Sequence, residues 1–137
     1  MLARQIHTGQ GSRFGESVIE HVERVAAAVH PEARTTALLH DLLERGRISR
    51  TKLRRHGLSA VELRALTLLT HAADEPYDVH VRRIADAPGP AGELARTVTL
   101  ADLDDHLAHT SIPCGAPPYA WARWWLLTAR EFAVESA

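Results

Sequence analysis

The stretch Ala37-Leu38-Leu39-His40-Asp41-Leu42-Leu43-Glu44 decides how this chain can fold. Its leucines and alanine predict a helix that is buried along much of its surface. The same stretch places a histidine directly before an aspartate, and both side chains are costly to bury unless they are paired or bound to a metal ion. His40 and Asp41 therefore indicate a functional site within an apolar helix.

Two further polar residues in apolar surroundings join this pair. His21 lies beside a stripe of valines at three- and four-residue spacing, and Asp102 lies in the segment Leu100-Ala101-Asp102-Leu103. Two imidazoles and two carboxylates form a mixed donor set that suits Mn, Fe, Co, Zn or Ni. We therefore expect His21, His40, Asp41 and Asp102, which come from three separate segments, to bind one divalent metal ion.

The composition argues against several other classes of protein. The formal net charge of −1 gives no electrostatic reason to expect nucleic acid or a membrane surface as a partner. The single cysteine, Cys114, excludes an internal disulfide bond and a zinc site built on several thiolates. No apolar stretch approaches the roughly 18 residues of a membrane span, and the N-terminus lacks the apolar core of a signal peptide. We expect a cytoplasmic protein with one domain over residues 1–137.

Helical periodicity recurs along the chain, whereas alternating strand patterns are scarce. The sequence therefore predicts an all-α fold, a compact bundle of about seven or eight helices. Ser59 and Glu62 have the spacing of a capping box, Pro31 suits the first turn of a helix, and Pro88-Gly89-Pro90 is typical of a turn. The expected helices cover the valine stripe Val18 to Val29 and the segments Pro31 to Arg45, Ser49 to His56, Ala60 to His71, Tyr77 to Ala85, Glu93 to His109 and Tyr119 to Val134.

The C-terminal segment, residues 117–135, is rich in tryptophan, with Trp121, Trp124 and Trp125 at helical spacing. Such bulk favours a place in the core or at an interface over stacking on a ligand. We expect this helix to cover the bundle or to pair with a second copy of the chain as a homo-oligomer.

Other polar residues are interpreted without a role in the metal site. Asp104 and Asp105, which follow Asp102, are expected to form a solvent-exposed acidic face. His71, His80 and His109 have no partner at metal-ligand spacing and are expected to be structural or exposed.

Several short segments, taken in order, carry a family resemblance. They are His7-Thr8-Gly9-Gln10, Arg13-Phe14-Gly15, Val18-Ile19-Glu20-His21-Val22, His40-Asp41-Leu42-Leu43-Glu44-Arg45, Leu69-Thr70 with Glu75-Pro76-Tyr77, and Thr99-Leu100-Ala101-Asp102-Leu103-Asp104-Asp105-His106. This ordered set, from about Ala3 to Leu107, resembles the HD superfamily of metal-dependent phosphohydrolases. Within that superfamily it is most similar to the single-domain (p)ppGpp hydrolases and to the hydrolase domain of the bifunctional Rel/Spo enzymes.

That resemblance implies an all-helical fold, a Mn²⁺-like ion and hydrolysis of the 3′-pyrophosphate of a guanosine nucleotide by metal-activated water. It assigns His21, His40, Asp41 and Asp102 as metal ligands and Glu44 as the residue that activates water. Glu44 shares one broad helix face with His40 and Asp41, and a carboxylate there is able to take a proton. The alternative for Glu44 is a solvent-facing residue near the end of the helix.

The expected substrate-binding residues are Arg13, Arg45, Tyr77 and His106. Arg45 stands where the family has an acidic residue, and His106 stands where it has asparagine. A guanidinium pairs bidentately with phosphoryl oxygens, so Arg45 suits phosphate, although a solvent-exposed cation at a helix end is the alternative. Tyr77 suits a nucleobase or its sugar, and its alternative is a place in the core.

Three functions stay open from the sequence, and each takes a small phosphorylated nucleotide as its partner. The first is a phosphohydrolase that acts on a (p)ppGpp-like nucleotide. The second is an HD-type nucleotidase or phosphodiesterase that acts on another nucleotide. The third is a catalytically inactive nucleotide-binding module, which is favoured by Arg45 and by Thr99, where the family has lysine.

Overall fold

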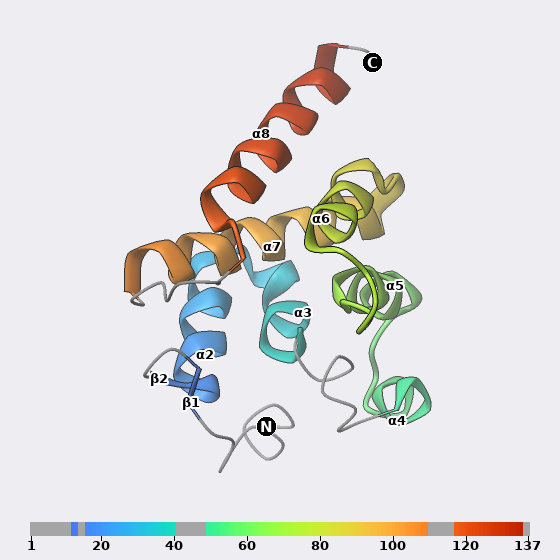
Figure 1. The fold of residues 1–137 in the computed structure, drawn as a ribbon. Coiled ribbons are helices and arrows are strands. Elements are labelled where there is room, and N and C mark those ends of the chain that lie inside the picture. The colour runs from blue at the N-terminus through green and yellow to red at the C-terminus, as the bar shows by residue number, and fades with distance from the viewer. Residues whose placement is uncertain (1–11, 14–15, 41–48, 110–116, 136–137) are drawn as a thin grey trace.

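Helices dominate the computed structural model, which describes residues 12–13, 16–40, 49–109 and 117–135 (Figure 1). The α-helices in these ranges are α2 (Val18–Ala28), α3 (Arg34–Leu39), α4 (Arg50–Arg55), α5 (Ala60–Leu69), α6 (Tyr77–Asp86), α7 (Gly89–His109) and α8 (Tyr119–Glu135). A short 3₁₀ turn, η1 (Pro31–Ala33), precedes α3, and two antiparallel two-residue strands, β1 (Ser12–Arg13) and β2 (Glu16–Ser17), precede α2. The prediction of an all-α helical bundle is confirmed. Among the described helices, none is long and apolar enough to cross a membrane.

Local sequence signals set some helix ends as predicted. The Ser59 hydroxyl accepts a hydrogen bond from the Glu62 N–H at 3.1 Å, and the Glu62 carboxylate accepts one from the Ser59 N–H at 3.0 Å, so the capping box of α5 forms. Pro31 also begins a helical segment, but that segment is a 3₁₀ turn, and the α-helix starts at Arg34. The predicted continuation of this helix from residue 41 onward lies outside the described residues.

The predicted start of the long helix at Glu93 is wrong, because α7 begins at Gly89 and includes Pro90. A proline in the first turn of a helix needs no N–H partner, so Pro90 is compatible with the helix rather than with a separate turn. The backbone passes close by at this point, since a Cβ atom at Gly92 would lie 2.0 Å from the carbonyl oxygen of Ala87. Glycine at this position lets the first turn of α7 pack against the segment that precedes it.

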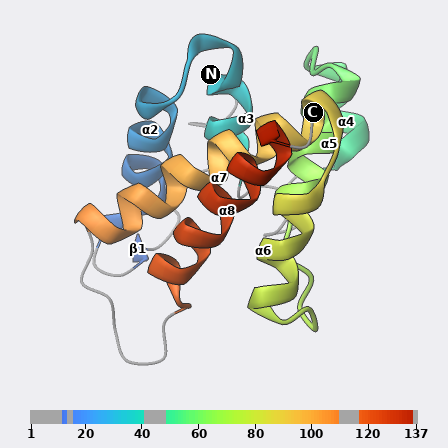
Figure 2. The same cartoon turned by 90° about the horizontal axis from the view of Figure 1, so that it is seen from above.

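Helix α7 lies at the centre of the bundle and contacts α2, α3, α5, α6 and α8 (Figures 1 and 2). In Figure 1, α2 and α3 lie on one side of α7 and α8 lies on the other. The α7 side chains of Ala95, Val98 and Leu103 are buried in the shared core. Because one helix meets so many others, a side chain on α7 can meet side chains from distant parts of the sequence.

The tryptophan-rich helix α8 packs on α6 and α7. Ala122 and Leu126 form its fully buried stripe, whereas Trp124 is 57% exposed. The guanidinium of Arg82 on α6 lies 4.1 Å from the ring centroid of Trp125, which is a cation–π contact between the two helices. Helix α8 therefore covers the bundle, and its pairing with a second copy of the chain stays a prediction.

Candidate metal centre

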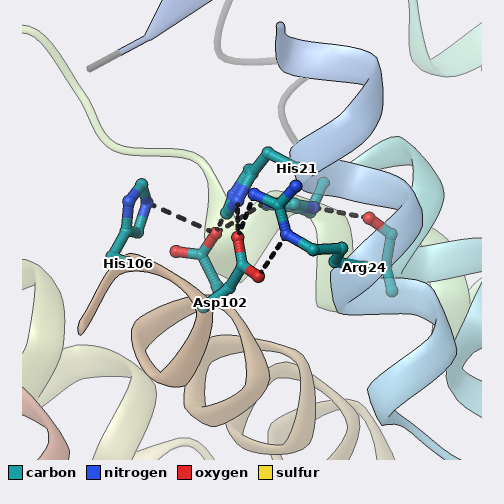
Figure 3. A network of polar contacts seen from close by, with 7 residues as sticks. His21, Arg24, Asp102 and His106 are labelled. Atoms are coloured by element: carbon teal, nitrogen blue, oxygen red, sulfur yellow. Dashed lines mark hydrogen bonds and ion pairs between the residues drawn. The ribbon is translucent and has the colours of Figure 1, made fainter. Parts of the chain in front are cut away.

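Three of the four predicted metal ligands meet beside α7. His21 comes from α2, His40 from the C-terminal end of α3 and Asp102 from the middle of α7. The Oδ1 atom of Asp102 lies 2.6 Å from His21 Nε2 and 3.1 Å from His40 Nε2 (Figure 3). Both imidazoles are buried, and the Asp102 side chain is 23% exposed. The cluster therefore lies within the bundle but is open to solvent on the side of Asp102.

The fourth predicted ligand, Asp41, lies outside the described residues, as do Glu44 and Arg45. The backbone of Arg13 belongs to β1, but its side chain is also outside the described set. The roles that the sequence predicts for these four residues therefore stay predictions.

His106 adds a third imidazole to the cluster. It lies one turn after Asp102 on α7, and its Nε2 atom is 3.6 Å from the same carboxylate oxygen. Figure 3 shows Asp102 between His106 and His21, and these three residues offer donor atoms that lie within 4.8 Å of one another. The sequence predicted that His106 binds substrate. Its position suits contact with either a metal ion or a substrate group beside that ion.

A second layer of contacts fixes the orientation of His21. The Nδ1 atom of His21 lies 2.7 Å from Asp105 Oδ2, and Asp105 accepts hydrogen bonds from Arg24 at 2.7 and 2.9 Å (Figure 3). Asp105 is only 7% exposed. The buried carboxylate thus connects a surface-reaching guanidinium to a candidate metal ligand.

The expectation that Asp104 and Asp105 form one solvent-exposed acidic face is wrong for Asp105. Residues three and four apart on a helix share a face, so Asp105 and His106 follow Asp102 toward α2. Asp104 points away and is exposed, as expected. The spacing of Asp102, Asp105 and His106 was the signal in the sequence that identifies this face.

The hydrogen bonds of the two candidate histidine ligands indicate which ring nitrogen carries the proton. The Nδ1 atom of His21 faces the Asp105 carboxylate, and that of His40 faces the carbonyl oxygen of Ala37. Since both partners are oxygen acceptors, each Nδ1 is the protonated donor. Metal-binding histidines have the same arrangement, with the second ring nitrogen bonded to a carboxylate or a backbone carbonyl.

In this cluster, hydrogen bonds and charges between neighbouring side chains affect the pKa values more than burial does. Burial by itself lowers the pKa of His21, but the hydrogen bond and charge of Asp102 raise that pKa above its ordinary value of 6.5. Burial by itself raises the pKa of Asp102, but hydrogen bonds from His21 and His40 hold it well below its ordinary range. The pKa of Asp105 is likewise lowered, because the hydrogen bonds of Arg24 and His21 outweigh its burial. Both carboxylates are therefore anionic at neutral pH.

This donor set fits a divalent metal ion. When Nδ1 carries the proton, Nε2 of each imidazole has a lone pair. The lone pairs of His21 and His40 would then be repelled by the anionic Oδ1 atom of Asp102, unless a proton or a metal cation lies between them. Two ligand atoms bound at about 2.1 Å and at right angles are about 3 Å apart. The contacts of 2.6, 3.1 and 3.6 Å to Asp102 Oδ1 bracket that spacing. His21, His40 and Asp102 are the described residues that would hold the ion, with His106 beside them.

A pocket of about 360 Å³ borders the cluster. His40, Asp102 and His106 line it together with Tyr77 and Tyr119. Tyr77, which the sequence predicted to bind substrate, therefore lies in the same pocket as the candidate ligands. Burial, followed by the charge of Asp102, raises the pKa of Tyr77 above its ordinary value of 10, so its hydroxyl keeps its proton. The volume falls within the roughly 300–1,000 Å³ of small-molecule sites.

Comparison with protein-family models finds no match for this chain, and comparison with curated proteins also finds none.

Proposed function

We propose that this protein is a divalent-metal-dependent phosphohydrolase that acts on a phosphorylated nucleotide. The observation that supports it most strongly is the meeting of three imidazole nitrogens at one oxygen of Asp102, on the wall of a pocket of about 360 Å³. Nitrogen donors combined with an anionic oxygen suit a divalent ion such as Mn, Fe, Co, Zn or Ni, and the family resemblance favours Mn²⁺ among them. Because Asp102 lines the pocket, an ion held there would face a ligand in that pocket.

A bound ion would polarise a phosphoryl oxygen and lower the pKa of a water molecule. The described side chains hold the donors in place for this chemistry. Asp105 and Arg24 orient the imidazole of His21, and the carbonyl oxygen of Ala37 orients that of His40. Little rearrangement is then needed when substrate binds, which is the physical basis of electrostatic preorganisation.

The family resemblance adds two residues that lie outside the described ranges, one as a metal ligand and one as a base. Asp41 would supply a second carboxylate to the ligand set. Glu44 would take the proton of the attacking water, and general base catalysis of this kind is worth about 10²–10⁴-fold in rate.

The resemblance to (p)ppGpp hydrolases favours a guanosine nucleotide with a 3′-pyrophosphate as the substrate. The oxygen of water would form a bond to the proximal phosphorus, and the bond between that phosphorus and the 3′ oxygen would break. The 3′ oxygen would take up a proton, so the products are a 3′-hydroxyl and pyrophosphate. Tyr77 and Tyr119 line the pocket and offer ring faces for stacking on a base.

One observation favours a nucleotide-binding module without turnover as the alternative. Thr99 stands where the (p)ppGpp hydrolases that the sequence resembles have lysine, and its hydroxyl donates to the carbonyl oxygen of Ala95 on the same helix at 2.7 Å. Position 99 therefore adds no cation to the pocket that Thr99 lines. A nucleotidase or phosphodiesterase that needs no cation at this position is also compatible with the same pocket.

The test combines metal binding with a hydrolysis screen. Protein stripped with a chelator is titrated with Mn²⁺ by calorimetry, and the Mn²⁺-loaded protein is then incubated with ppGpp, nucleoside monophosphates and cyclic nucleotides. We expect Mn²⁺ binding and Mn²⁺-dependent release of pyrophosphate or phosphate. Binding of Mn²⁺ and ppGpp without turnover of any compound would contradict the hydrolase and favour the binding module.

Asp102→Ala and Asp104→Ala form a matched pair for this test, because both residues lie on α7 and only Asp102 faces the cluster. We expect Asp102→Ala to abolish Mn²⁺-dependent turnover and to weaken Mn²⁺ binding. Asp104→Ala, which loses only an exposed ion pair with Arg123, is expected to behave like the wild type. Circular dichroism of both variants separates a lost site from a lost fold.

A further inference from the structure

His80 ends a series of aromatic rings that starts at the candidate metal centre. The ring of His106 stacks on Tyr119 with centroids 4.7 Å apart, and Tyr119 meets Tyr77 edge to face at 6.4 Å. Tyr77 meets His71 at 6.3 Å, and His71 stacks on His80 at 4.6 Å. All five residues line the same pocket. The sequence predicted His71 and His80 to be structural or exposed, but the structure places both in the pocket wall, at the opposite end of this ring series from His106.

The contacts of His80 favour one position for its proton. Arg83 Nη2 lies 3.1 Å from His80 Nδ1, and Glu75 Oε1 lies 3.3 Å from the same nitrogen. The Arg83 guanidinium also donates to both carboxylate oxygens of Glu75, each at 3.1 Å. A guanidinium can only donate, so the shorter contact makes Nδ1 an acceptor and places the proton of the neutral ring on Nε2. Among the described residues, both contacts engage Nδ1 and leave Nε2 as the nitrogen able to donate within the pocket that His80 lines.

The surroundings keep His80 neutral at physiological pH. Burial, followed by the nearby His71 and Arg83, lowers the pKa of His80 to about 4, although Glu75 opposes this shift. The side chain is 11% exposed. His80 is therefore a neutral ring in the pocket at physiological pH and not a cation for phosphate.

The other residues that line the pocket suit an uncharged part of the ligand at the end where His80 lies. Among the described residues that line it, none is lysine or arginine. Aromatic faces and aliphatic side chains such as Leu69 and Val81 make up most of the wall between the metal-ligand end and His80. Such a surface favours a flat, neutral group that carries a few hydrogen-bond acceptors.

We propose that His80 is a specificity-determining residue whose Nε2–H donates to an acceptor atom on the nucleoside part of the substrate. This inference rests on the proposed function, because the phosphate end of the ligand is assigned to the metal centre. The nucleoside would lie along the rings of Tyr119, Tyr77 and His71, with its acceptor atom at His80.

The first experiment measures binding and needs no turnover. Dissociation constants of ppGpp, used as an analogue with a methylene group in place of the 3′ oxygen so that it is not hydrolysed, and of inorganic pyrophosphate as a probe without a nucleoside, are measured by calorimetry with Mn²⁺ for the wild type, His80→Phe and His80→Gln. His80→Phe keeps a flat ring on His71 but lacks the donor, whereas glutamine restores an N–H near the position of Nε2. His56→Phe, at an exposed histidine on the end of α4, is the matched control.

We expect His80→Phe to weaken ppGpp binding about two- to tenfold, which is the effect of one lost neutral hydrogen bond. Pyrophosphate binding should not change, His80→Gln should recover most of the loss, and His56→Phe should match the wild type. Equal weakening of both ligands, no weakening of either, or no ppGpp binding by the wild type would overturn the proposal for His80. Failure of hydrolysis in the screen above would instead contradict the proposed reaction and leave this selective effect standing.

A second experiment observes the proton of His80 directly in the wild type. Long-range ¹H–¹⁵N spectra report which imidazole nitrogen is protonated, and the spectrum of His80→Gln assigns the His80 signals. We expect a neutral His80 with its proton on Nε2 at pH 7, and a shift of that proton when ppGpp is added but not when pyrophosphate is added. A proton on Nδ1, or a cationic ring at pH 7, would overturn the proposal even if His80→Phe failed to fold.

Discussion

Arg24 donates to both carboxylate oxygens of Asp105, at 2.7 and 2.9 Å, although the two residues are 81 positions apart. The same carboxylate holds Nδ1 of His21, whose Nε2 faces Asp102. A carboxylate bonded to a metal-binding histidine fixes the tautomer and the direction of the ring. The pair of Arg24 and Asp105 therefore prepares His21 for its proposed role before an ion binds.

The first prediction follows from this pair. Asp105→Ala should lower the affinity for Mn²⁺ about 10- to 100-fold, as is usual when the partner of a metal-binding histidine is lost. Calorimetric titration of the chelator-treated protein measures the effect, and Asp104→Ala on the exposed side of α7 is the control. Equal Mn²⁺ affinities for the two variants would mean that Asp105 does not support the metal centre.

The second prediction concerns Asp41, which the sequence pattern predicts to be a metal ligand and which lies outside the described residues. Asp41→Ala should abolish Mn²⁺-dependent hydrolysis while the helical bundle stays folded, because the loss of an anionic ligand changes both the affinity and the geometry of the site. Turnover at saturating Mn²⁺ and far-ultraviolet circular dichroism measure the two effects. Full activity of the variant at high Mn²⁺ would remove Asp41 from the ligand set.

The sequence was sufficient to predict the all-α fold and the meeting of His21, His40 and Asp102. The meeting could be predicted because polar side chains in apolar helical stretches need polar partners, and these three residues are partners of one another. The capping box of Ser59 and Glu62 was equally local, so it also could be predicted. The fold class and the capping box depend on residue types and on spacing along one helix, whereas the meeting of the three residues was inferred from their need for polar partners and from the order of the motifs.

Other features that depend on packing between helices were not predicted. The burial of Asp105 requires Arg24 from another helix, and the proximity of Tyr119 to His106 requires the docking of α8 on α7. The pocket position of His80 likewise arises from its stacking on His71, which lies outside α6. A single sequence shows the periodicity of one helix but not which helix lies opposite a given face.

The third prediction concerns Glu44 as the proposed base. Glu44→Gln keeps the size of the side chain but removes its ability to take a proton, so kcat should fall about 10²–10⁴-fold while KM changes little. Steady-state kinetics with ppGpp and added Mn²⁺ make the measurement. A kcat equal to that of the wild type would exclude Glu44 from the mechanism.

The fourth prediction concerns Arg45, which stands where the (p)ppGpp hydrolases that the sequence resembles have an acidic residue. If its guanidinium pairs with phosphate, Arg45→Ala should raise KM for ppGpp more than for a nucleoside monophosphate and should leave kcat nearly unchanged. The two substrates are compared in the same assay. Equal changes for both would favour the alternative, a solvent-exposed cation at the end of the helix.

The last prediction is a pH dependence of stability that arises from His80. Its pKa is about 4 in the folded protein and 6.5 when the ring is free, so the unfolded chain binds more protons between these values. Stability due to the neutral ring is therefore fully present above pH 6.5 and is lost as the pH falls toward 4. Between pH 7 and pH 5 the free energy of unfolding should fall by about 1.5–2 kcal/mol more in the wild type than in His80→Gln. Urea unfolding of both proteins at the two pH values measures this difference, because the groups that do not interact with His80 titrate alike in both proteins. An equal fall in both proteins would show that Glu75 stabilises the protonated ring enough to offset its burial beside His71 and Arg83.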